Sequence, residues 1–318
     1  MTQVFRDALG PCLFPNGSVL SIGAFDGVHL GHAALIACLV ETARARRLPP
    51  VLLSFEPLPR AYFQKATPLV RLCSPREKIE RAAELGVDAV GLLRFNKALA
   101  DMPAERFIED VLIARLNARE IWIGPDFRFG HGRRGDVGML ERFAGTHGYT
   151  VKVLPVCEIN QERVSSTRIR SALLASRFEE AETLLGRPYS ISGRVIRGQQ
   201  LGRTLGYPTA NLSLHGRVPP VHGIYAVRVT GAGMRDYPSV ASIGNRPTVN
   251  GKELLLEVHL FDFNGDLYGQ RLTVDFVAKI RDEVRFASLD DLVERMHIDA
   301  RDARALLQSH PVRNRPSL

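Results

Sequence analysis

The pattern of apolar residues changes about halfway along this chain, and that change constrains the fold more than any other feature. In the first half, short apolar runs typical of strands alternate with longer segments of helical periodicity. The strand-like runs are 17–23, 51–55, 88–93, 120–124 and 149–156, and the helical segments are 30–47, 74–85, 101–117 and 136–147. Strands separated by helices need right-handed crossovers, so this half predicts an α/β fold with a parallel sheet. Such sheets bind ligands beyond the carboxyl ends of their strands.

The second half reads mainly as strands. Two helical segments, 166–175 and 178–185, come first, and Gly186 and Pro188 then interrupt the pattern. The strand-like runs that follow are 190–197, 224–230, 240–243, 253–263 and 271–280, before a final helix over 288–308. Asn264-Gly265 predicts a hairpin between the last two strands, because both residues tolerate positive φ. We therefore expect a small antiparallel barrel with a C-terminal helix, and domains at 1–186 and 187–318.

Composition and charge limit the class of protein without choosing a partner. A chain of 318 residues corresponds to about two domains of about 150 residues. The net charge of +8 permits anionic partners such as nucleic acid, acidic membranes or phosphate-bearing metabolites. The amino terminus lacks the apolar core of a signal peptide, and the longest apolar run, 33–40, is too short for a membrane span. We expect a cytoplasmic protein whose four cysteines, none in a CxxC pair, are structural thiols.

The first candidate site follows the first predicted strand, at Gly23-Ala24-Phe25-Asp26-Gly27-Val28-His29-Leu30-Gly31-His32. Its glycines allow the backbone to approach a ligand closely. His29 and His32 are spaced i and i+3, so they share one face of the first helical turn. That turn presents unpaired N–H groups, and the two imidazoles beside them could stabilise the charge of a phosphate group during transfer. The alternatives are a helix cap with a core histidine, or a pair of metal ligands.

A second group of donors lies at Arg163-Val164-Ser165-Ser166-Thr167-Arg168-Ile169-Arg170. Arginines at a helix amino terminus oppose the helix dipole, and a bound anion would relieve that conflict. Two donor-rich helix termini could therefore converge on one polyphosphate. The alternative is an ordinary Ser/Thr helix cap.

The run Gly130-His131-Gly132-Arg133-Arg134-Gly135 matches GxGxxG, but it does not indicate a dinucleotide site. It follows the fourth predicted strand rather than the first, and no acidic residue follows at the required distance in a strand-end context. A basic loop near phosphates and a plain surface turn both remain open. The chain contains no GxxxxGK[ST] motif, which excludes the P-loop class.

The second half carries its own candidate site. Gly198, Gly202 and Gly206 recur at every fourth residue, with Arg203 among them, and could form a flap over phosphates. Thr209 and Asn211 then offer two oxygen ligands for Mg²⁺ on one side of an extended chain. The alternative is a glycine-rich hairpin that ends in a Pro-Thr turn. Farther on, Glu257 alternates with apolar residues, and the pattern alone allows either a solvated strand acid or a general base.

Several motifs in the first half resemble a known family. FDGVHLGH with SSTRIR is similar to the nucleotidyltransferases, which transfer AMP or CMP and release pyrophosphate. FEPLPR and GPDFRFG resemble the FMN adenylyltransferase module of the bacterial bifunctional riboflavin kinase/FAD synthetases. The resemblance implies a Rossmann-like domain in which the FMN phosphate attacks the α-phosphorus of ATP directly, with Mg²⁺. It implies catalytic roles for His29, His32 and Arg170. The implied ATP and phosphate ligands are Gly23, Phe25, Asp26, Gly31, Arg163, Ser166 and Thr167, and the implied flavin ligands are Phe55, Pro57 and Asp126.

Motifs in the second half resemble the riboflavin kinase module of the same family. They are GxxLGRxLGYPTAN, GIYAV, IGNRPTV and LEVHLFDF. The resemblance implies a six-stranded barrel of Greek-key character, in which Thr209 and Asn211 bind Mg²⁺ with ATP. It implies that Gly198, Gly202, Arg203 and Gly206 form the phosphate flap. It makes Glu257 the general base that takes the proton of the riboflavin 5′-hydroxyl.

The resemblance covers about residues 17–296, with three departures from the common pattern at Ala24, Pro125 and Gln199. It implies an enzyme that phosphorylates riboflavin to FMN and adenylylates FMN to FAD, with ATP, Mg²⁺ and flavins as its small-molecule partners. It implies neither nucleic acid nor membrane as a partner and leaves the oligomeric state open. Two rival hypotheses are a nucleotidyltransferase for another acceptor with a passive barrel, and a basic nucleic-acid-binding protein.

Overall fold

The structure is a computed structural model that describes residues 2–64, 66, 68–198, 202, 205–248 and 251–311, with backbone alone at 245–248 and 251–253. The chain forms two compact units: Met1–Leu69 with Cys73–Ser166, and Val70–Leu72 with Thr167–Leu318. The division predicted after residue 186 stays a prediction. It differs from these units chiefly by two helices, α7 (Ser166–Leu174) and α8 (Phe178–Leu185).

The first unit is built on a six-stranded parallel sheet, as the alternation of strands and helices predicts. The strand order is β1-β4-β3-β2-β5-β6. The strands are β1 (Gln3–Phe5), β2 (Ser18–Ile22), β3 (Pro50–Glu56), β4 (Ala89–Arg94), β5 (Ala118–Ile123) and β6 (Thr150–Val153). The chain runs outward from β2 in both directions, so β2 is the point at which the strand order reverses. Ligand crevices in open parallel sheets form at this point.

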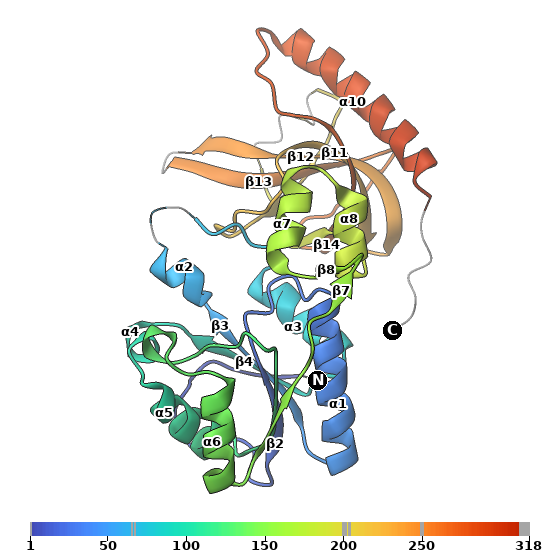
Figure 1. The fold of residues 1–318 in the computed structure, drawn as a ribbon. Helices are drawn as coiled ribbons and strands as arrows, with labels where there is room; N and C mark the ends of the chain where they lie inside the picture. The colour runs from blue at the N-terminus through green and yellow to red at the C-terminus, as the bar shows by residue number, and fades with distance from the viewer. Residues whose placement is uncertain are drawn as a thin grey trace. The chain divides into compact units, whose positions relative to one another are not determined.

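Helices cover both faces of this sheet. Val19 and Leu52 point to one face, where Ile36 and Leu39 of α1 (Leu30–Arg46) cover them together with α3 (Pro75–Glu84). Leu20, Leu53 and Ile121 point to the other face, against a helical segment of α5 (Ala104–Arg106) and η1 (Phe107–Arg115), and α6 (Val137–His147). Figure 1 shows α1 and α6 on opposite sides of the sheet. The short elements of the unit are α2 (Pro59–Phe63), α4 (Lys97–Ala100), η2 (His131–Arg133), β7 (Glu158–Ile159) and β8 (Glu162–Arg163).

One predicted helix of this unit has a different start and a different form. The helix expected over 101–117 begins at Ala104, because Pro103 disfavours helical backbone at the residue before it. From Phe107 to Arg115 it is a π-helix. The capping box predicted at the start of α3 is confirmed: the Ser74 hydroxyl accepts from the backbone N of Glu77, and the Glu77 carboxylate accepts from that of Ser74.

The second unit contains a closed six-stranded antiparallel barrel, as predicted. Its strand order is β10-β13-β12-β11-β14-β9, and β9 pairs with β10 to close it. The strands are β9 (Ser190–Ile196), β10 (Ala210–Ser213), β11 (Gly223–Gly231), β12 (Met234–Thr248), β13 (Gly251–Leu260) and β14 (Arg271–Arg281). α10 (Leu289–Ser309) packs across β11, β12 and β14 through Ala303 and Leu307 (Figure 1).

The hairpin predicted from Asn264-Gly265 is wrong. β13 and β14 are consecutive in the chain but do not pair. A strand has two edges, and those of β13 are already occupied by β10 and β12. β14 instead pairs with β11 and β9, so the residues between β13 and β14 form a longer connection across the barrel.

Candidate active sites

The first site begins with a loop in an uncommon backbone conformation directly after β2. Phe25 and Val28 have φ angles of 47° and 41°, and Gly27 between them has a φ of 84°. For residues other than glycine, such angles cost about 1–3 kcal/mol each. The loop therefore needs contacts that hold it. It stands at the carboxyl end of β2, where the strand order predicts a ligand crevice.

Cys73, distant in the sequence, forms hydrogen bonds that hold this loop. The backbone N of Cys73 donates to Asp26 Oδ1 at 3.2 Å, and the backbone N of Gly27 donates to Cys73 Sγ at 3.1 Å. Burial raises the pKa of the Cys73 thiol to about 11, so the thiol is neutral at physiological pH. The Asp26 carboxylate is buried and directed at Cys73, so it supports the loop.

The two histidines lie together at the start of α1. His29 is the N-cap of the helix, and its Nδ1 accepts a hydrogen bond from the backbone N of His32 at 3.3 Å. Because Nδ1 is the acceptor, a neutral His29 carries its proton on Nε2 and is a donor there. The two rings stack with centroids 3.7 Å apart, and the Phe25 ring also packs on His32, with centroids 5.0 Å apart.

Burial is the main cause that holds the pKa of His32 well below 6.5, followed by the nearby His29 and Lys78. His32 is therefore neutral at physiological pH. The geometry matches the alternative of a cap and a buried histidine, and it also leaves a pair of imidazoles beside a helix amino terminus. These two descriptions are compatible, because a capping histidine still presents its second ring nitrogen.

The second donor motif meets the first through Ser166. The Ser166 hydroxyl donates to the backbone O of Asp26 at 2.8 Å, across 140 residues of chain. Arg163, on β8, pairs with the exposed carboxylate of Asp126, which follows β5. Thr167 and Arg170 follow on α7, which belongs to the second unit from Thr167 onward. The structure thus brings Ser166 to Asp26 of the FDGVHLGH segment within the first unit.

Aromatic side chains gather beside the residues predicted to bind flavin. Phe55, near the end of β3, contacts Phe95 edge to face with ring centroids 5.8 Å apart. Tyr62 and Phe63 of α2 pack on Phe95 at 5.3 and 5.8 Å, and Phe63 remains exposed. Pro57 and Asp126 follow β3 and β5, the two strands that flank β2. The predicted residues thus lie at or just after the ends of the two strands on either side of β2. The sequence analysis missed the aromatic cluster of Tyr62, Phe63 and Phe95.

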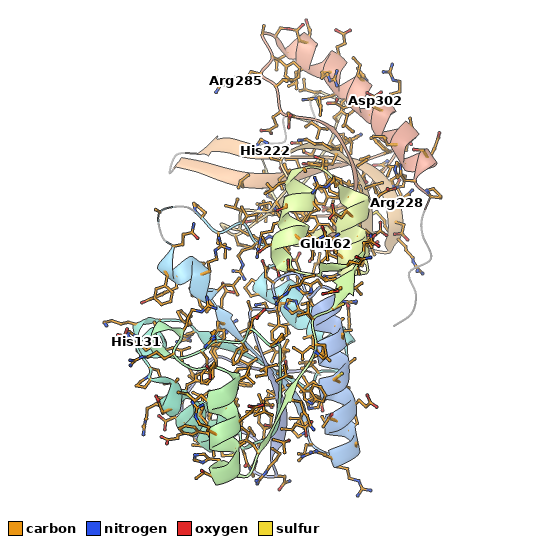
Figure 2. The ribbon with its side chains drawn as sticks, in the orientation of Figure 1. His131, Glu162, His222, Arg228, Arg285 and Asp302 are labelled. Atoms are coloured by element: carbon orange, nitrogen blue, oxygen red, sulfur yellow. The ribbon has the colours of Figure 1, made fainter. Side chains whose placement is uncertain are left out.

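The loop of residues 130–135 is anchored on the start of α5. The backbone N of His131 donates to the backbone O of Met102, and a Cβ on Gly130 would meet the backbone of Ala104 at 2.6 Å. The His131 side chain is exposed (Figure 2). This geometry fits the surface turn that the sequence left open.

The barrel site rests on the register of two strands. Asn211 of β10 pairs directly with Glu257 of β13, so their side chains are neighbours on one face of the barrel wall. On β13, Leu256, Val258 and Leu260 are buried, while Glu257 and His259 alternate onto the opposite face. Asn211 is buried, and its Oδ1 accepts no hydrogen bond from any residue that the structure describes. An orphaned buried oxygen beside a carboxylate indicates a place for a ligand.

The glycines that recur at every fourth residue, Gly198, Gly202 and Gly206, lie near Asn211 and in the turn before it. A Cβ on Gly198 would lie 2.6 Å from Nδ2 of Asn211, and a Cβ on Gly202 would lie 2.3 Å from the backbone O of Tyr207. The backbone O of Gly202 accepts from the backbone N of Tyr207 at 2.7 Å. Gly206 has a φ of 80°. Arg203 lies outside the described residues.

A cavity of about 700 Å³ opens at this face of the barrel. Thr209, Ser242 and Glu257 line its polar part, and Phe286, Leu292 and Met296 line an apolar part. His222, directly before β11, and Arg285, between β14 and α10, also line it; Figure 2 labels both residues. A second cavity of about 660 Å³ shares Tyr207 and His259 with the first.

The donor set at Asn211 fits a magnesium ion. The described residues hold no group of three or more His, Cys, Asp or Glu side chains that could form an all-protein metal cage. Mg²⁺ commonly keeps several waters and takes one or two protein oxygens besides substrate phosphates. Asn211 Oδ1, which has no hydrogen-bond partner among the described residues, and the hydroxyl of Thr209 two residues before it are oxygens of that kind.

Some residues of both sites were missed because their roles depend on packing. The first loop is supported by Cys73, Lys78 and Ser54. Of these, Lys78 could have been noticed in the sequence, because it is spaced i, i+4 from Ala82 on the buried side of α3. Leu292 and Met296, spaced i and i+4 on the last helix, form part of a cavity wall. Arg281 and Asp299 line the same cavity.

Two protein-family models match this amino-acid sequence, one in each half of the chain. The model described as FAD synthetase matches residues 13–168, and the model described as riboflavin kinase matches residues 185–307. The structure contains no helix, within the described residues, that is both long and apolar enough to span a membrane.

Curated relatives match nearly the whole chain. A bifunctional riboflavin kinase/FMN adenylyltransferase of Escherichia coli (strain K12) is 46% identical over 290 residues, covering 91% of this chain and 92% of the relative. Proteins of the same name from Pseudomonas fluorescens and Haemophilus influenzae are 45% and 43% identical, each over 92% of this chain and over 93% and 96% of themselves. A solved structure titled macrolide-efflux protein, from Streptococcus pneumoniae, is 33% identical and superimposes with a TM-score of 0.77, covering 95% of this chain and 98% of its own.

Proposed function

The chain belongs to the family of bifunctional riboflavin kinase/FMN adenylyltransferases, and from that premise we propose which of its residues carry each reaction. The riboflavin kinase half transfers the γ-phosphoryl group of ATP to the 5′-hydroxyl of riboflavin. The FMN adenylyltransferase half joins AMP to FMN and releases pyrophosphate. The observation that carries the assignment in the barrel is the strand register that pairs Asn211 with Glu257, a carboxylate that lines the cavity of about 700 Å³.

In the barrel, Glu257 acts as the general base. Glu257 and Thr209 line the polar part of the cavity. Phe286, Leu292 and Met296 line its apolar part. A flavin ring in the apolar part would place its ribityl chain and 5′-hydroxyl toward Glu257. The carboxylate can then accept the hydroxyl proton as the oxygen attacks phosphorus.

Asn211 and Thr209 would hold Mg²⁺ with the ATP phosphates. The ion, when bound, neutralises the charge that develops on the transferring phosphoryl group. Gly198 and Gly202 leave room for the phosphates, because side chains there would collide with Asn211 and the backbone of Tyr207. Arg203 belongs to this proposal on the resemblance alone.

The second cavity is proposed to take the adenosine part of ATP. Tyr207 and His259 line both cavities, so an adenosine in the second cavity would have its phosphates directed toward Thr209 in the first. Phe261 and the guanidinium of Arg304, stacked 4.2 Å from its centroid, provide flat surfaces suited to a planar base.

In the first unit, His29 and His32 are proposed to bind the phosphates of ATP. His29 donates through Nε2, because its Nδ1 caps the helix. Ser166 brings the second donor segment to Asp26, and Arg163 adds a cation beside Asp126. These groups stabilise charge on the α-phosphate and on the leaving pyrophosphate while the FMN phosphate attacks, so the residues contribute position and electrostatics and form no covalent intermediate.

The remaining assignments to this site follow the resemblance. Phe55, Pro57 and Asp126 are proposed for FMN, and the exposed ring of Phe63 offers it a further stacking surface. Gly23, Phe25, Gly31, Thr167 and Arg170 are proposed for ATP. We propose that the protein works in the cytoplasm on small molecules, without nucleic acid or membrane as a partner.

The test separates the two activities in the full chain. Purified protein is incubated with riboflavin or with FMN, ATP and Mg²⁺, and flavins are separated by chromatography over time. His29→Ala should abolish FAD formation and spare FMN formation, and Glu257→Gln should abolish FMN formation from riboflavin and spare FAD formation from FMN. His147→Ala on α6 and Glu294→Gln on α10 are matched controls that should retain both. Loss of both activities in either site variant, in a folded protein, would overturn the two-site assignment.

A further inference from the structure

A lysine is completely buried beneath the loop of the adenylyltransferase site. Lys78, on α3, is 0% exposed. Its Nζ donates to the backbone O of Ala24 at 2.7 Å and to the Ser54 hydroxyl at 2.8 Å. The Ser54 hydroxyl in turn donates to the same oxygen of Ala24 at 3.1 Å. Lysine is almost never fully buried in a protein unless its charge is compensated, so this position calls for a reason.

The contacts of Lys78 fall on Ala24, the residue before the first positive-φ residue of the loop. Ala24 directly precedes Phe25, the first of the two residues with positive φ other than glycine. Cys73 and Ser166 hold the loop farther on, at Asp26 and Gly27. The contact at Ala24 is made by the ammonium and the Ser54 hydroxyl that it binds, and charge-assisted hydrogen bonds are about twice as strong as neutral ones.

The loop that Lys78 holds also places the histidines. Phe25 packs on His32, and Val28 leads directly into the N-cap residue His29. A rotation of the backbone at Ala24 would therefore move the ring that supports His32. The charge of Lys78 is felt at the same place, because it is one of the causes that lower the pKa of His32.

We propose that Lys78 is a positioning residue of the adenylyltransferase reaction, whose buried ammonium holds the carbonyl of Ala24 and thereby sets His29 and His32 against the ATP phosphates. The proposal rests on the proposed function of the two histidines. Lys78 itself touches no reacting atom in this account. Its removal should lower the rate of adenylyl transfer in protein that remains folded.

The experiment uses full-length Lys78→Met, Lys78→Arg, Ser54→Ala and a buried control, Glu120→Gln. Glu120 is 2% exposed, and its partners Arg46, Trp122 and Thr150 belong to neither proposed site. For each protein, kcat and KM for ATP are measured for FAD formation from FMN, together with FMN formation from riboflavin and the thermal unfolding midpoint. Kinetics are measured well below every midpoint, so that loss of stability alone does not change the rate.

Lys78→Met should lower kcat for FAD formation at least about tenfold, since a misplacement of about 1 Å can cost 10²-fold. Lys78→Arg should recover part of that loss, and Ser54→Ala should lose less than Lys78→Met in the same reaction. FMN formation should stay within twofold in all of them, and Glu120→Gln should lose stability with its kcat unchanged.

A wild-type kcat in folded Lys78→Met, or equal loss of kcat in Glu120→Gln, would overturn the proposal. If Lys78→Met does not fold, Ser54→Ala decides: an unchanged kcat there would count against the positioning role. Failure of the wild-type protein to form FAD from FMN would instead refute the proposed function of the site.

Discussion

Replacing Asp299 by Asn tests how the last helix is held against the kinase cavity. Asp299 of α10 is 4% exposed and accepts from Nε and Nη2 of Arg281, at the end of β14, at 2.9 and 2.6 Å. Nε of Arg295 donates to the same carboxylate at 3.1 Å. Leu292 and Met296 of this helix line the cavity, so the ion pair fixes one wall of the proposed flavin site.

The magnitude follows from burial. Breaking a buried ion pair by changing one partner costs about 3–5 kcal/mol, because the other charge remains buried and unpaired. Asparagine keeps one acceptor oxygen, and the side chain of Arg281 is 15% exposed and also donates to the backbone O of Asp282, so part of its charge stays solvated. We therefore expect the second unit to lose about 2–3 kcal/mol, or about 4–12 °C in Tm for a domain of this size.

The assay is the midpoint of heat inactivation, followed for both activities in one sample of full-length protein. FMN formation should be lost at a lower temperature in Asp299→Asn, with a raised KM for riboflavin. The midpoint for FAD formation from FMN should fall less, because α7, with Thr167 and Arg170, is the part of the second unit proposed for that reaction. Asp302→Asn is the matched control, because Asp302 is exposed on the same helix and pairs with its neighbour Arg301 (Figure 2). That exposed pair is worth about 0–1 kcal/mol. Equal shifts in the two variants, or none in Asp299→Asn, would refute the reasoning.

Two further predictions concern single residues of the sites. Gly198→Ala should lower the rate of FMN formation at least about tenfold in initial-rate measurements and leave FAD formation from FMN unchanged, because the new Cβ would displace the Asn211 amide 2.6 Å away. Burial lowers the pKa of His32 in the folded protein, so below about pH 6.5 the unfolded chain binds more protons than the folded one. The free energy of unfolding should therefore decrease as the pH is lowered from about 6.5 toward the folded-state pKa. Denaturant titrations should show this slope, at most about 1.4 kcal/mol per pH unit, reduced in His32→Gln; equal slopes would contradict it.

Much of the fold and part of each site followed from local pattern. Helical spacing places His29 and His32 on one turn, and strand alternation separates Glu257 and His259 from Leu256 and Val258, as the structure confirms. The structure also places the loops that carry candidate residues at the carboxyl ends of β2, β3 and β5, and that ligands bind there stays a prediction. These features depend on residues that are close to each other in the chain, so they can be predicted from one sequence.

Local signals failed where two distant segments competed. Asn264-Gly265 has the composition of a tight hairpin, yet β13 had no free edge for β14, and closure of the barrel decided the pairing. β10 is four residues long and was not predicted, although it carries Asn211. A strand this short gains its stability from its neighbours β9 and β13 rather than from its own residues.

By itself, the sequence determined the two types of fold, the order of the longer helices and strands, and the residue types at each candidate site, since these depend on periodicity and composition over short windows. Tertiary structure alone decided that Asn211 faces Glu257, that Ser166 reaches Asp26 and that Lys78 lies buried under Ala24. Each of these contacts joins residues 46 to 140 positions apart. Bringing such distant residues together costs conformational entropy, because long loops must close. The packing of the hydrophobic cores offsets that cost, and this packing exists only in the folded protein.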